Sequence, residues 1–490
     1  MPSPSRRTSR AALLVAALLA TSLAACAPAG SGAAPRTGDV ARVAPPAVDT
    51  AAFLDTLQRR TFDWFWETTN PRNGLTPDRW PTKSFSSVAA VGFALTAYPI
   101  GVERGWVTRE QAAERTLRTL RFFWNAPQGA DSVGVTGHQG FFYHFLDMES
   151  GLRFRDVELS TIDTTLLLGG VLVCQQYFAR DTPAEREIRA LADSLYQRAN
   201  WAWTVRDAPL VSMGWRPERG WIESDWKGYD ESTILYVLAL ASPTYPVAPA
   251  AWEAYTRTYR WGTFHGYEHV NFAPLFGHQY SHLWIDFRGI QDAYMRGKGI
   301  DYFENARRAT LAQRAHAIRN PGDWKGYDAQ VWGLTASDGP IDTTMVIRGR
   351  ARTFHTYWAR GAALADIRDD GTIVPTAAGG SVPFAPEIAI PALMTMRDRY
   401  GSDLWTRYGF LDAFNPTFDL TGVPLRHGRV VPGKGWFDGN YLGIDQGPIL
   451  IMIENHRTGM IWELMRRSPH IARGLCRAGF TGGWLEGRCD

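Results

Sequence analysis

Residues 160–178, with the sequence STIDTTLLLGGVLVCQQYF, decide which class of fold the chain can adopt. Between positions 162 and 174 the segment has apolar residues on nearly every side of a helix. A second segment, 448–453, has the same character. A helix that is apolar on all sides belongs in the interior of a protein. Both segments therefore predict buried helices in a layered helical structure.

Helical periodicity recurs along most of the chain, and clusters of Pro and Gly separate the periodic segments. Alternation with period two is scarce, and 326–376 is the only sizeable stretch that could hold short strands. Roughly a dozen helices joined by long loops suit two concentric helical layers. We predict an all-α fold, an (α/α)6 barrel (toroid) with long aromatic-rich loops at one end. The predicted helices are 51–68, 86–98, 108–125, 160–178, 184–203, 231–241, 249–261, 280–294, 303–318, 386–400 and 446–467.

The first 48 residues have the layout of an export signal followed by a tether. Arg6 and Arg7 precede an apolar run at 11–20, and Leu-Ala-Ala-Cys closes it at 23–26. These four residues resemble the bacterial lipoprotein box, in which Cys26 is lipidated; an ordinary signal peptide is the alternative. We predict a lipoprotein signal peptide at 1–25, a flexible tether at 26–48 and one catalytic domain with a C-terminal tail at 49–490. The expected location is the periplasm or cell envelope, with a membrane contact only through the lipid on Cys26.

The composition excludes some partners and favours one class of ligand. Fifty-two Lys and Arg residues against 49 Asp and Glu residues leave a formal charge of +3, so a nucleic-acid partner is not expected. Hydrophobic content of 45% and charged content of 21% fit a globular protein. The 20 Trp, 18 Tyr and 24 Phe residues suit sugar binding, because aromatic rings stack on the apolar faces of sugars. The alternative is that these rings fill the core of a large helical protein.

Cysteines and short motifs give no sign of a metal or a cofactor. Cys174 lies in an apolar run and is expected to be a buried free thiol. A disulfide between Cys476 and Cys489 would hold the C-terminal tail in an oxidising compartment, although the sequence alone leaves its formation open. CxxC pairs, HExxH and phosphate-binding glycine loops do not occur in a convincing context. We therefore expect no metal, no cofactor, and neither hydride nor phosphoryl transfer.

Acidic residues gather in aromatic-rich segments at 141–163, 221–231, 278–288 and 436–448. Glycoside hydrolysis needs one carboxylic acid to protonate the leaving oxygen and one carboxylate to activate water or attack carbon. These segments supply several candidates for both roles. The hexapeptide Asp-Trp-Lys-Gly-Tyr-Asp also occurs twice, at 225–230 and 323–328. Its carboxylates and rings around a glycine are typical of a loop that could contact sugars.

Three blocks carry a resemblance to a known family. Residues 275–286 (LFGHQYSHLWID), 156–164 (DVELSTIDT) and 443–448 (GIDQGP) resemble the bacterial glucoamylase-like domain. Proteins with that domain include the β-1,2-glucanases of glycoside hydrolase family 144. The blocks also resemble a domain of cyclic β-1,2-glucan synthases. The resemblance extends over about 53–468. It implies an (α/α)6 barrel, an inverting mechanism and a β-1,2-linked glucan as substrate.

Three carboxylates are the predicted catalytic residues. Glu231 is assigned as the general acid, Asp445 as the general base, and Asp163 as a further site carboxylate. Each has an alternative explanation at a helix start, where an acidic side chain favours the dipole or caps the first turn. A helix N-terminus lowers a carboxyl pKa, so an acid at Glu231 would need burial or a neighbouring carboxylate to raise it.

The predicted substrate-binding residues come from the same segments. His278 and His282 are one helical turn apart, which would place them with Asp286 on one face, and Arg288 could orient Asp286. Satisfied core histidines and stacked core rings are the alternative. The full set is Glu158, Glu223, Trp226, Tyr229, His278, Tyr280, His282, Trp284, Asp286, Arg288, Trp436 and Gln446.

These observations together predict an exported, monomeric glycoside hydrolase that cleaves β-1,2-glucan with inversion. Two kinds of alternative stay open, one enzymatic and one non-catalytic. The domain could perform transglycosylation or cut another glucan, or it could be a non-catalytic glycan-binding lipoprotein.

Overall fold

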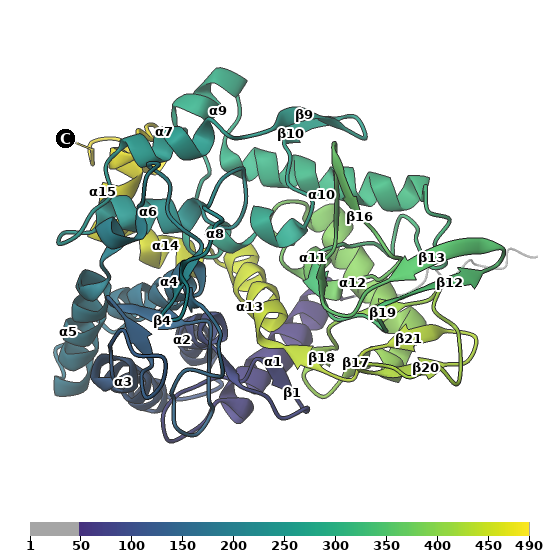
Figure 1. The fold of residues 1–490 in the computed structure, drawn as a ribbon, viewed down its shortest axis with the longest axis horizontal. Coiled ribbons are helices and arrows are strands. Elements are labelled where there is room, and N and C mark those ends of the chain that lie inside the picture. The colour runs from purple at the N-terminus through teal and green to yellow at the C-terminus, as the bar shows by residue number, and fades with distance from the viewer. Residues whose placement is uncertain (1–48, 490) are drawn as a thin grey trace, which may run out of the picture. The chain divides into compact units, whose positions relative to one another are not determined.

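The fold is described by a computed structural model, which covers residues 49–489. The predictions for the signal peptide and the tether therefore lie outside the described residues. Within 49–489 the chain forms fifteen α-helices (Figure 1). They are α1 Thr50–Thr68, α2 Val88–Glu103, α3 Arg109–Asn125, α4 Thr161–Tyr177, α5 Pro183–Arg198, α6 Thr233–Ala241, α7 Ala250–Thr256, α8 Tyr280–Trp284, α9 Ala293–Lys298, α10 Tyr302–Arg319, α11 Pro375–Gly379, α12 Pro386–Tyr400, α13 Gly443–Arg457, α14 Met460–Arg466 and α15 Pro469–Arg477.

Six of these helices are buried on nearly all sides: α2, α4, α6, α8, α11 and α13. In α4 every residue from 161 to 174 is buried, and so is 448–453 in α13, as the sequence predicts. Contacts join α2 to α4 and α13, α4 to α6, and α13 to α8 and α11. The buried helices therefore pack mainly against one another and form the inner layer.

Glycines allow α2 and α4 to pack backbone against backbone. A Cβ atom at Gly170 would lie 2.0 Å from the carbonyl oxygen of Gly92, and one at Gly92 would lie 2.1 Å from that of Leu166. Neither distance is sterically possible, so a side chain at either position would force the helices apart. Of the double glycine in the deciding segment, Gly170 has this packing role, and a Cβ atom at Gly169 would lie 2.8 Å from the ring of Trp284.

The remaining long helices have one buried face and pack outside the inner layer. Helix α1 contacts α13 and α2, α3 contacts α5 and α2, and α5 contacts α4. Helix α12 contacts α11, and α15 contacts α6. In chain order, outer and inner helices alternate from α1 to α6, which is the pattern of successive helical hairpins.

Two predicted helices are interrupted in the structure. The one predicted at 280–294 ends at Trp284, and Ile285 is extended before Asp286 accepts a hydrogen bond from the backbone N–H of Arg288. The one predicted at 446–467 is divided between α13 and α14 by Gly459, whose φ is +73°. Glycine adopts this left-handed conformation without the penalty that a Cβ imposes. Helices α11 and α15 were not among the predicted segments.

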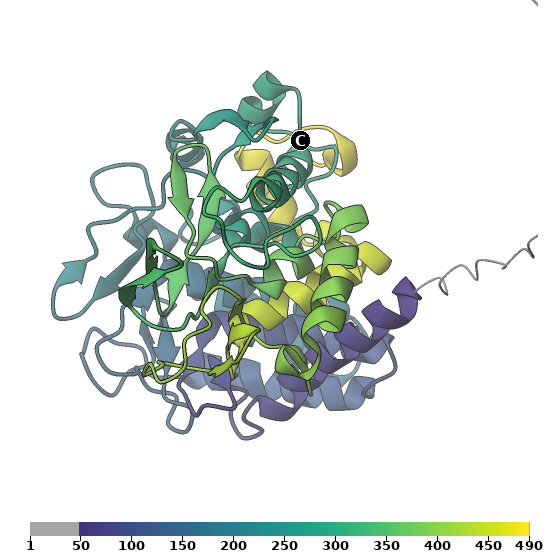
Figure 2. The same ribbon diagram turned by 90° about the vertical axis from the view of Figure 1, so that its right-hand side faces the viewer.

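The loops hold 22 short strands within the described residues, none longer than five residues, so strands are not confined to 326–376. All the paired strands run antiparallel; the largest sheet has the order β3-β4-β6-β7-β8. Figure 2 shows most of them on one side of the longer helices. Their bounds are β1 Arg79–Trp80, β2 Ser86–Ser87, β3 Gly137–His138, β4 Phe141–Tyr143, β5 Phe145–Leu146, β6 Leu159–Ser160, β7 Gly214–Arg216, β8 Gly220–Trp221, β9 Trp261–Phe264, β10 Tyr267–Val270, β11 Ala336–Ser337, β12 Thr343–Ile347, β13 Arg350–Phe354, β14 Trp358–Ala359, β15 Gly361–Ala363, β16 Asp366–Arg368, β17 Trp405–Thr406, β18 Gly409–Phe410, β19 Phe414–Asn415, β20 Arg429–Val431, β21 Gly435–Phe437 and β22 Tyr441–Leu442.

The prediction for Cys174 is confirmed, and the disulfide that the sequence left open is formed. Cys476 and Cys489 form a disulfide with a Cα–Cα distance of 5.2 Å, and Cys174 is a buried free thiol. Among the helices of residues 49–489, none combines the length and the apolar character that a membrane span requires.

Candidate active site

A cavity of about 300 Å³ lies where the N-terminal ends of several buried helices meet. Asp163 comes from the first turn of α4, Tyr280 begins α8, and Ile444 comes from the first turn of α13. Ala89 is the second residue of α2, and Glu231 lies two residues before α6. The loops that carry three of the predicted site carboxylates, Glu158, Asp163 and Glu231, thus meet at one cavity. Trp226 is also part of its wall.

Glu231 has the environment of a general acid. It precedes Ser232, the N-cap of α6, and its carbonyl accepts a hydrogen bond from the hydroxyl of Ser281 at 3.0 Å. Its Oε2 atom is buried and has no hydrogen-bond partner within residues 49–489. Burial, with the nearby charges of Asp230 and Asp163, raises the pKa of Glu231 well above its usual range. Burial and neighbouring carboxylates therefore outweigh the helix N-terminus, and the shift has the direction that a general acid needs.

Asp230, beside Glu231, is held in a fixed orientation. Its Oδ1 atom accepts hydrogen bonds from the backbone N–H of Ser232 at 3.0 Å and from the hydroxyl of Tyr255 at 3.1 Å. Burial raises the pKa of Asp230 to about 7, although these hydrogen bonds oppose the shift. Its charge is thus positioned to act on the neighbouring Glu231.

Asp163 and Glu158 are linked through His144, which the sequence did not single out. The His144 Nδ1 atom lies 2.9 Å from Glu158 Oε1, and Nε2 lies 3.5 Å from Asp163 Oδ1. Burial would lower the pKa of His144, but the charges of Asp163 and Glu158 raise it to about 9. Burial would raise the pKa of Glu158, but His144 and Arg216 lower it to about 2. At neutral pH this part of the wall is therefore an imidazolium between two carboxyl groups.

Burial raises the pKa of Asp163, and the charge of His144 partly opposes the shift. Ser160, the N-cap of α4, accepts a hydrogen bond from the Asp163 N–H at 3.2 Å and donates its own hydroxyl proton to the Asp163 carboxylate. The spacing that suggests a cap from sequence is therefore a cap, and it also orients a carboxyl group of the cavity wall.

Asp445 belongs to a second acidic group beside the cavity. Its neighbour Ile444 lines the cavity, and the Ile444 carbonyl accepts a hydrogen bond from the hydroxyl of Tyr280 at 3.0 Å. Burial raises the pKa of Asp445 to about 7 even though a hydrogen bond with Asp412 opposes the shift. Burial and the charge of Asp445 raise the pKa of Asp412 well above its usual range. Each of the two carboxyl groups therefore affects the pKa of the other.

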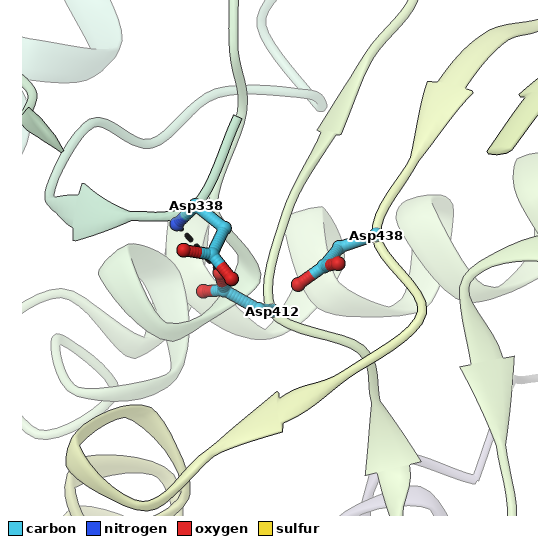
Figure 3. Close-up of side chains that lie close together, drawn as sticks. All are labelled: Asp338, Asp412 and Asp438. Carbon is cyan, nitrogen blue, oxygen red and sulfur yellow. Dashed lines mark hydrogen bonds between the residues drawn. The ribbon is translucent and has the colours of Figure 1, made fainter. Parts of the chain in front are cut away.

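Asp338 and Asp438 complete this group, and Figure 3 shows them with Asp412 pointing toward one another. The backbone N–H of Asp338 donates to Asp412 Oδ2 at 2.8 Å. All three side chains are buried, and carboxylate oxygens of the three lie within 4.8 Å of one another. The Arg79 guanidinium compensates part of the charge through Asp338, at 2.5 Å, and Asp78, at 3.1 Å.

Within residues 49–489, Asp338, Asp412 and Asp438 are also the group whose geometry could hold a metal ion. Carboxylate oxygens are the ligands that Ca²⁺ and Mg²⁺ prefer. The buried Oδ1 of Asp412 and Oδ2 of Asp438 have no hydrogen-bond partner in the described chain. These oxygens could equally accept hydrogen bonds from water or a hydroxyl group, which is the chemistry that a hydrolase site needs.

Several predicted sugar-binding rings lie in the core and away from the cavity. The Trp284 indole donates to the Thr96 hydroxyl at 3.0 Å and stacks on Phe93, and the side chain is fully buried. Trp436 is also fully buried and donates to the carbonyl of His427 at 2.9 Å. These placements support the alternative explanation, in which rings fill a helical core, for both tryptophans.

His278 and His282 do not share one helical face, because α8 begins only at Tyr280. His278 is buried, and its Nε2 atom lies 3.2 Å from the Phe272 carbonyl oxygen. His282 packs against the rings of Phe287 and Phe384, and neither of its nitrogens has a hydrogen-bond partner in the described chain. Neither histidine lines the cavity.

The other predicted contacts also have structural partners. Arg288 binds Asp286 through two hydrogen bonds of 2.8 Å, as predicted, but the pair lies outside the cavity lining. Gln446 is buried and donates to the Phe410 carbonyl at 3.2 Å. Tyr229 lines a different cavity of about 350 Å³, and Glu223 is exposed beside the cavity residue Ile222.

Sequence reasoning missed His144, Tyr357, Asp412 and Asp338. Each lies in a loop, and the two aspartates are brought to Asp445 from distant parts of the chain. Asp438 was within a quoted acidic segment but was not chosen. The one usable signal was the density of acidic and aromatic residues in these loops, which indicates a region and no individual side chain.

Comparisons with known proteins show which family the chain resembles. The sequence profile of the Glycoamylase family, described as "Putative glucoamylase", matches residues 223–469. An exo β-1,2-glucooligosaccharide sophorohydrolase (non-reducing end) from Parabacteroides distasonis is 30% identical over 457 residues. That match covers 86% of this chain and 57% of the relative, so the chain spans little more than half of that protein.

Two solved structures have the same fold. A Bacteroides uniformis ATCC 8492 protein of the same description has a TM-score of 0.75 and 32% identity, covering 89% of this chain and 99% of its own. The endo-β-1,2-glucanase of Chitinophaga pinensis, solved with sophorotriose and glucose, has a TM-score of 0.75 and 28% identity, covering 90% and 100%. The matched range 223–469 spans the positions of Glu231, Tyr280 and Asp445. The chain belongs to the Glycoamylase family and has its helix-rich, glucoamylase-like fold.

Proposed function

We propose that this protein is a glycoside hydrolase that cleaves β-1,2-glucan with inversion. The single observation that carries the proposal is the cavity that Glu231 lines as a buried carboxyl group of raised pKa, with Ile444, the neighbour of Asp445, in the same wall. An acid in the cavity and a carboxylate beside it are the two groups that hydrolysis of a glycosidic bond requires. Relatives that act on β-1,2-glucans support the choice of linkage.

In the proposed reaction the two groups have separate proton roles. Glu231 donates its proton to the glycosidic oxygen as the bond to the anomeric carbon breaks. Asp445, as the ionised member of its pair with Asp412, takes a proton from the water that attacks the opposite face of the sugar. Each cycle therefore leaves Glu231 ionised and the aspartate pair protonated, and solvent restores both.

Tyr280 links the wall of the cavity to the segment that carries Asp445. Its ring is part of the cavity wall, and its hydroxyl donates to the carbonyl of Ile444, next to Asp445. Burial and the charges of Asp445, Glu231 and Asp163 raise the pKa of Tyr280 well above its usual range, so its hydroxyl remains a donor. We assign Tyr280 to the positioning of α13 against the cavity.

The fold proposed for this site is the (α/α)6 barrel. Helices α2, α4, α6, α8, α11 and α13 would form the inner ring, and the amphipathic helices would form the outer ring. The contacts among inner helices and the alternation along the chain support this arrangement. Export as a monomeric lipoprotein anchored through Cys26 is part of the proposal and is supported by the sequence of residues 1–26.

A product assay tests the substrate. Purified protein is incubated with linear β-1,2-glucan and, in parallel, with α-1,4- and β-1,4-glucans, and the products are separated by chromatography. We expect short β-1,2-linked products from the first substrate alone. Cleavage of another glucan, or elongated products that indicate transglycosylation, would overturn the proposed substrate or reaction. Binding without any cleavage would support the non-catalytic alternative.

The anchor has its own test. Mass spectrometry of the native N-terminus should show a lipid on Cys26, and Cys26→Ser should release the protein from membranes. An unmodified N-terminus produced by cleavage elsewhere would contradict the anchor and would leave the enzymatic proposal unaffected.

A further inference from the structure

The turn between β13 and β14 is fixed on both sides of Tyr357. The backbone N–H of His355 donates to Asp370 at 3.1 Å. The backbone N–H and the hydroxyl of Thr356 donate to Asp342 at 2.9 and 2.6 Å. On the other side, β14 pairs with β11 in a register that places Trp358 opposite Ser337. The backbone position of Tyr357 is therefore set by hydrogen bonds on each side of it.

A buried arginine reinforces this turn. Arg360 is fully buried and binds both oxygens of Asp370 at 2.8 Å. Its remaining donors reach the carbonyls of Ser337 at 2.7 Å, His355 at 3.0 Å and Thr356 at 3.1 Å. A guanidinium whose donors are all used in this way holds the groups around it in a fixed arrangement. Its effect is to hold the residues on both sides of Tyr357 against the domain.

The Tyr357 side chain itself makes no such contact. The side chain is 50% exposed, and its hydroxyl has no hydrogen-bond partner within residues 49–489. Yet Tyr357 lines the same cavity as Glu231 and Asp163. Ile444, the neighbour of Asp445, belongs to the same cavity wall as Tyr357. A neutral phenol group therefore faces the place where the cavity adjoins the second acidic group.

We propose that Tyr357 is a substrate-contacting residue that binds one glucose unit between Glu231 and Asp445. Its ring covers the apolar face of the sugar, and its hydroxyl forms a hydrogen bond with a sugar hydroxyl. Because the turn is already fixed, little conformational freedom is lost when the sugar binds. This assignment rests on the proposed function, since it needs a glucan in the cavity.

The experiment uses two Tyr357 variants and a matched control in the full chain. Tyr357→Phe removes only the hydroxyl, and Tyr357→Ala also removes the ring. Tyr245→Ala is the control, because Tyr245 is 46% exposed and lies outside the cavity. For each variant, kcat and KM are measured on linear β-1,2-glucan oligosaccharides, and the melting temperature is recorded. Binding of the same oligosaccharides is measured by calorimetry in the Glu231→Gln background.

We expect Tyr357→Phe to raise KM by about threefold to tenfold, the scale of one lost hydrogen bond. Tyr357→Ala should raise KM and weaken oligosaccharide binding by more than tenfold, since the ring contact is lost as well. The melting temperature should stay that of the wild type, as should the kinetics of Tyr245→Ala. A merely structural role would lower the melting temperature and leave KM unchanged.

Two failures are distinguishable. If the wild type cleaves the glucan and Tyr357→Ala matches it in KM and affinity, the assignment of Tyr357 is wrong and the proposed function stands. If the wild type neither cleaves nor binds the glucan, the proposed function fails, and the Tyr357 contact fails with it. Should Tyr357→Ala not fold, Tyr357→Phe decides, because it preserves the ring: a KM equal to that of the wild type would then overturn the hydrogen bond.

Discussion

The two copies of Asp-Trp-Lys-Gly-Tyr-Asp, at 225–230 and 323–328, share two local features and lie in different surroundings. In both copies the glycine has a positive φ, +79° at Gly228 and +92° at Gly326. In both, the last aspartate accepts a hydrogen bond from the backbone N–H two residues later, at 3.0 Å for Asp230 and 2.7 Å for Asp328. The copies differ at the first aspartate, since Asp323 has a φ of +52° and Asp225 forms a bridge with Ser212.

The surroundings of the two copies differ. Trp226 lines the active-site cavity and donates to the Thr161 hydroxyl at 2.9 Å, whereas the Arg352 guanidinium lies over the ring of Trp324, 4.2 Å from its centroid. Asp230 is buried beside Glu231, whereas Asp328 pairs with Arg399 at a partly exposed site. The residue after the first copy is Glu231, and the residue after the second is Ala329. The motif therefore specifies a turn, and the next residue and the nearby helix give the first copy its chemistry.

The largest effect is expected from Glu231→Gln. The amide keeps the shape of the side chain but cannot donate an acidic proton, so turnover should fall by about 10²–10⁴-fold. The melting temperature should not fall, because the substitution removes a buried ionisable group. A matched change at the second copy, Asp328→Asn, should leave turnover within twofold of the wild type. A loss of only a few-fold in Glu231→Gln would transfer the acid role to Asp163, whose pKa is also raised.

Substitutions of Trp324 and Trp226 should distinguish an effect on stability from an effect on activity. Trp324→Ala removes a buried ring outside the cavity, and we expect it to lower the free energy of unfolding by about 3–5 kcal/mol. Its kcat/KM per folded molecule should stay near that of the wild type. Trp226→Ala should lower both quantities. Chemical denaturation and steady-state kinetics on the same samples check this, and equal loss of kcat/KM in both variants would contradict the comparison.

The aspartates should differ in their effect on the pH profile. Asp230 contributes to the raised pKa of Glu231, after burial. Replacing it with Asn removes that contribution, so the Glu231 pKa falls and the acid loses its proton at lower pH. The alkaline limb of the kcat/KM profile should therefore move to lower pH in Asp230→Asn. Asp328→Asn is the control, and its profile should overlay that of the wild type; a shift in both would point to a global effect.

His144 should give the smallest effect, on stability rather than on turnover. Its pKa is raised to about 9 in the folded protein, against about 6.5 in an unfolded chain. The group therefore stabilises the fold fully below about pH 6.5, and this contribution is lost as the pH rises to about 9. Urea denaturation of the wild type should show this decline, and His144→Gln should reduce it. An equal decline in the variant would assign it to other groups.

How much of the fold could be predicted from the sequence depends on how far apart in the chain the interacting residues lie. Helices such as 160–178 were predictable because periodicity and burial are encoded within each segment. Ser160 capping at Asp163 was predictable for the same reason. The interruption after Trp284 was not, because the Asp286–Arg288 contact competes with the helix at a position where no Gly or Pro marks an end.

The candidate site was predictable as a region and only in part as a set of side chains. Glu231, Asp163 and Glu158 share one cavity because helix starts converge there, which follows from the layered fold. Asp412 lies near Asp445 only because of the tertiary fold, so no local sequence pattern predicts that the two residues are neighbours. Trp284 and Trp436 show the opposite error, since an aromatic ring near acidic residues has the same sequence pattern whether it binds a sugar or fills a core.

The central claim is that Glu231 and the Asp445–Asp412 pair hydrolyse a β-linked glucan with inversion. The most direct measurement is proton NMR of the anomer formed first when the wild-type protein cleaves linear β-1,2-glucan, recorded before mutarotation. The account predicts that the new reducing end appears first in the α configuration and that Glu231→Gln forms it far more slowly. A new reducing end that appears first in the β configuration would contradict the mechanism, whichever carboxylates carry it.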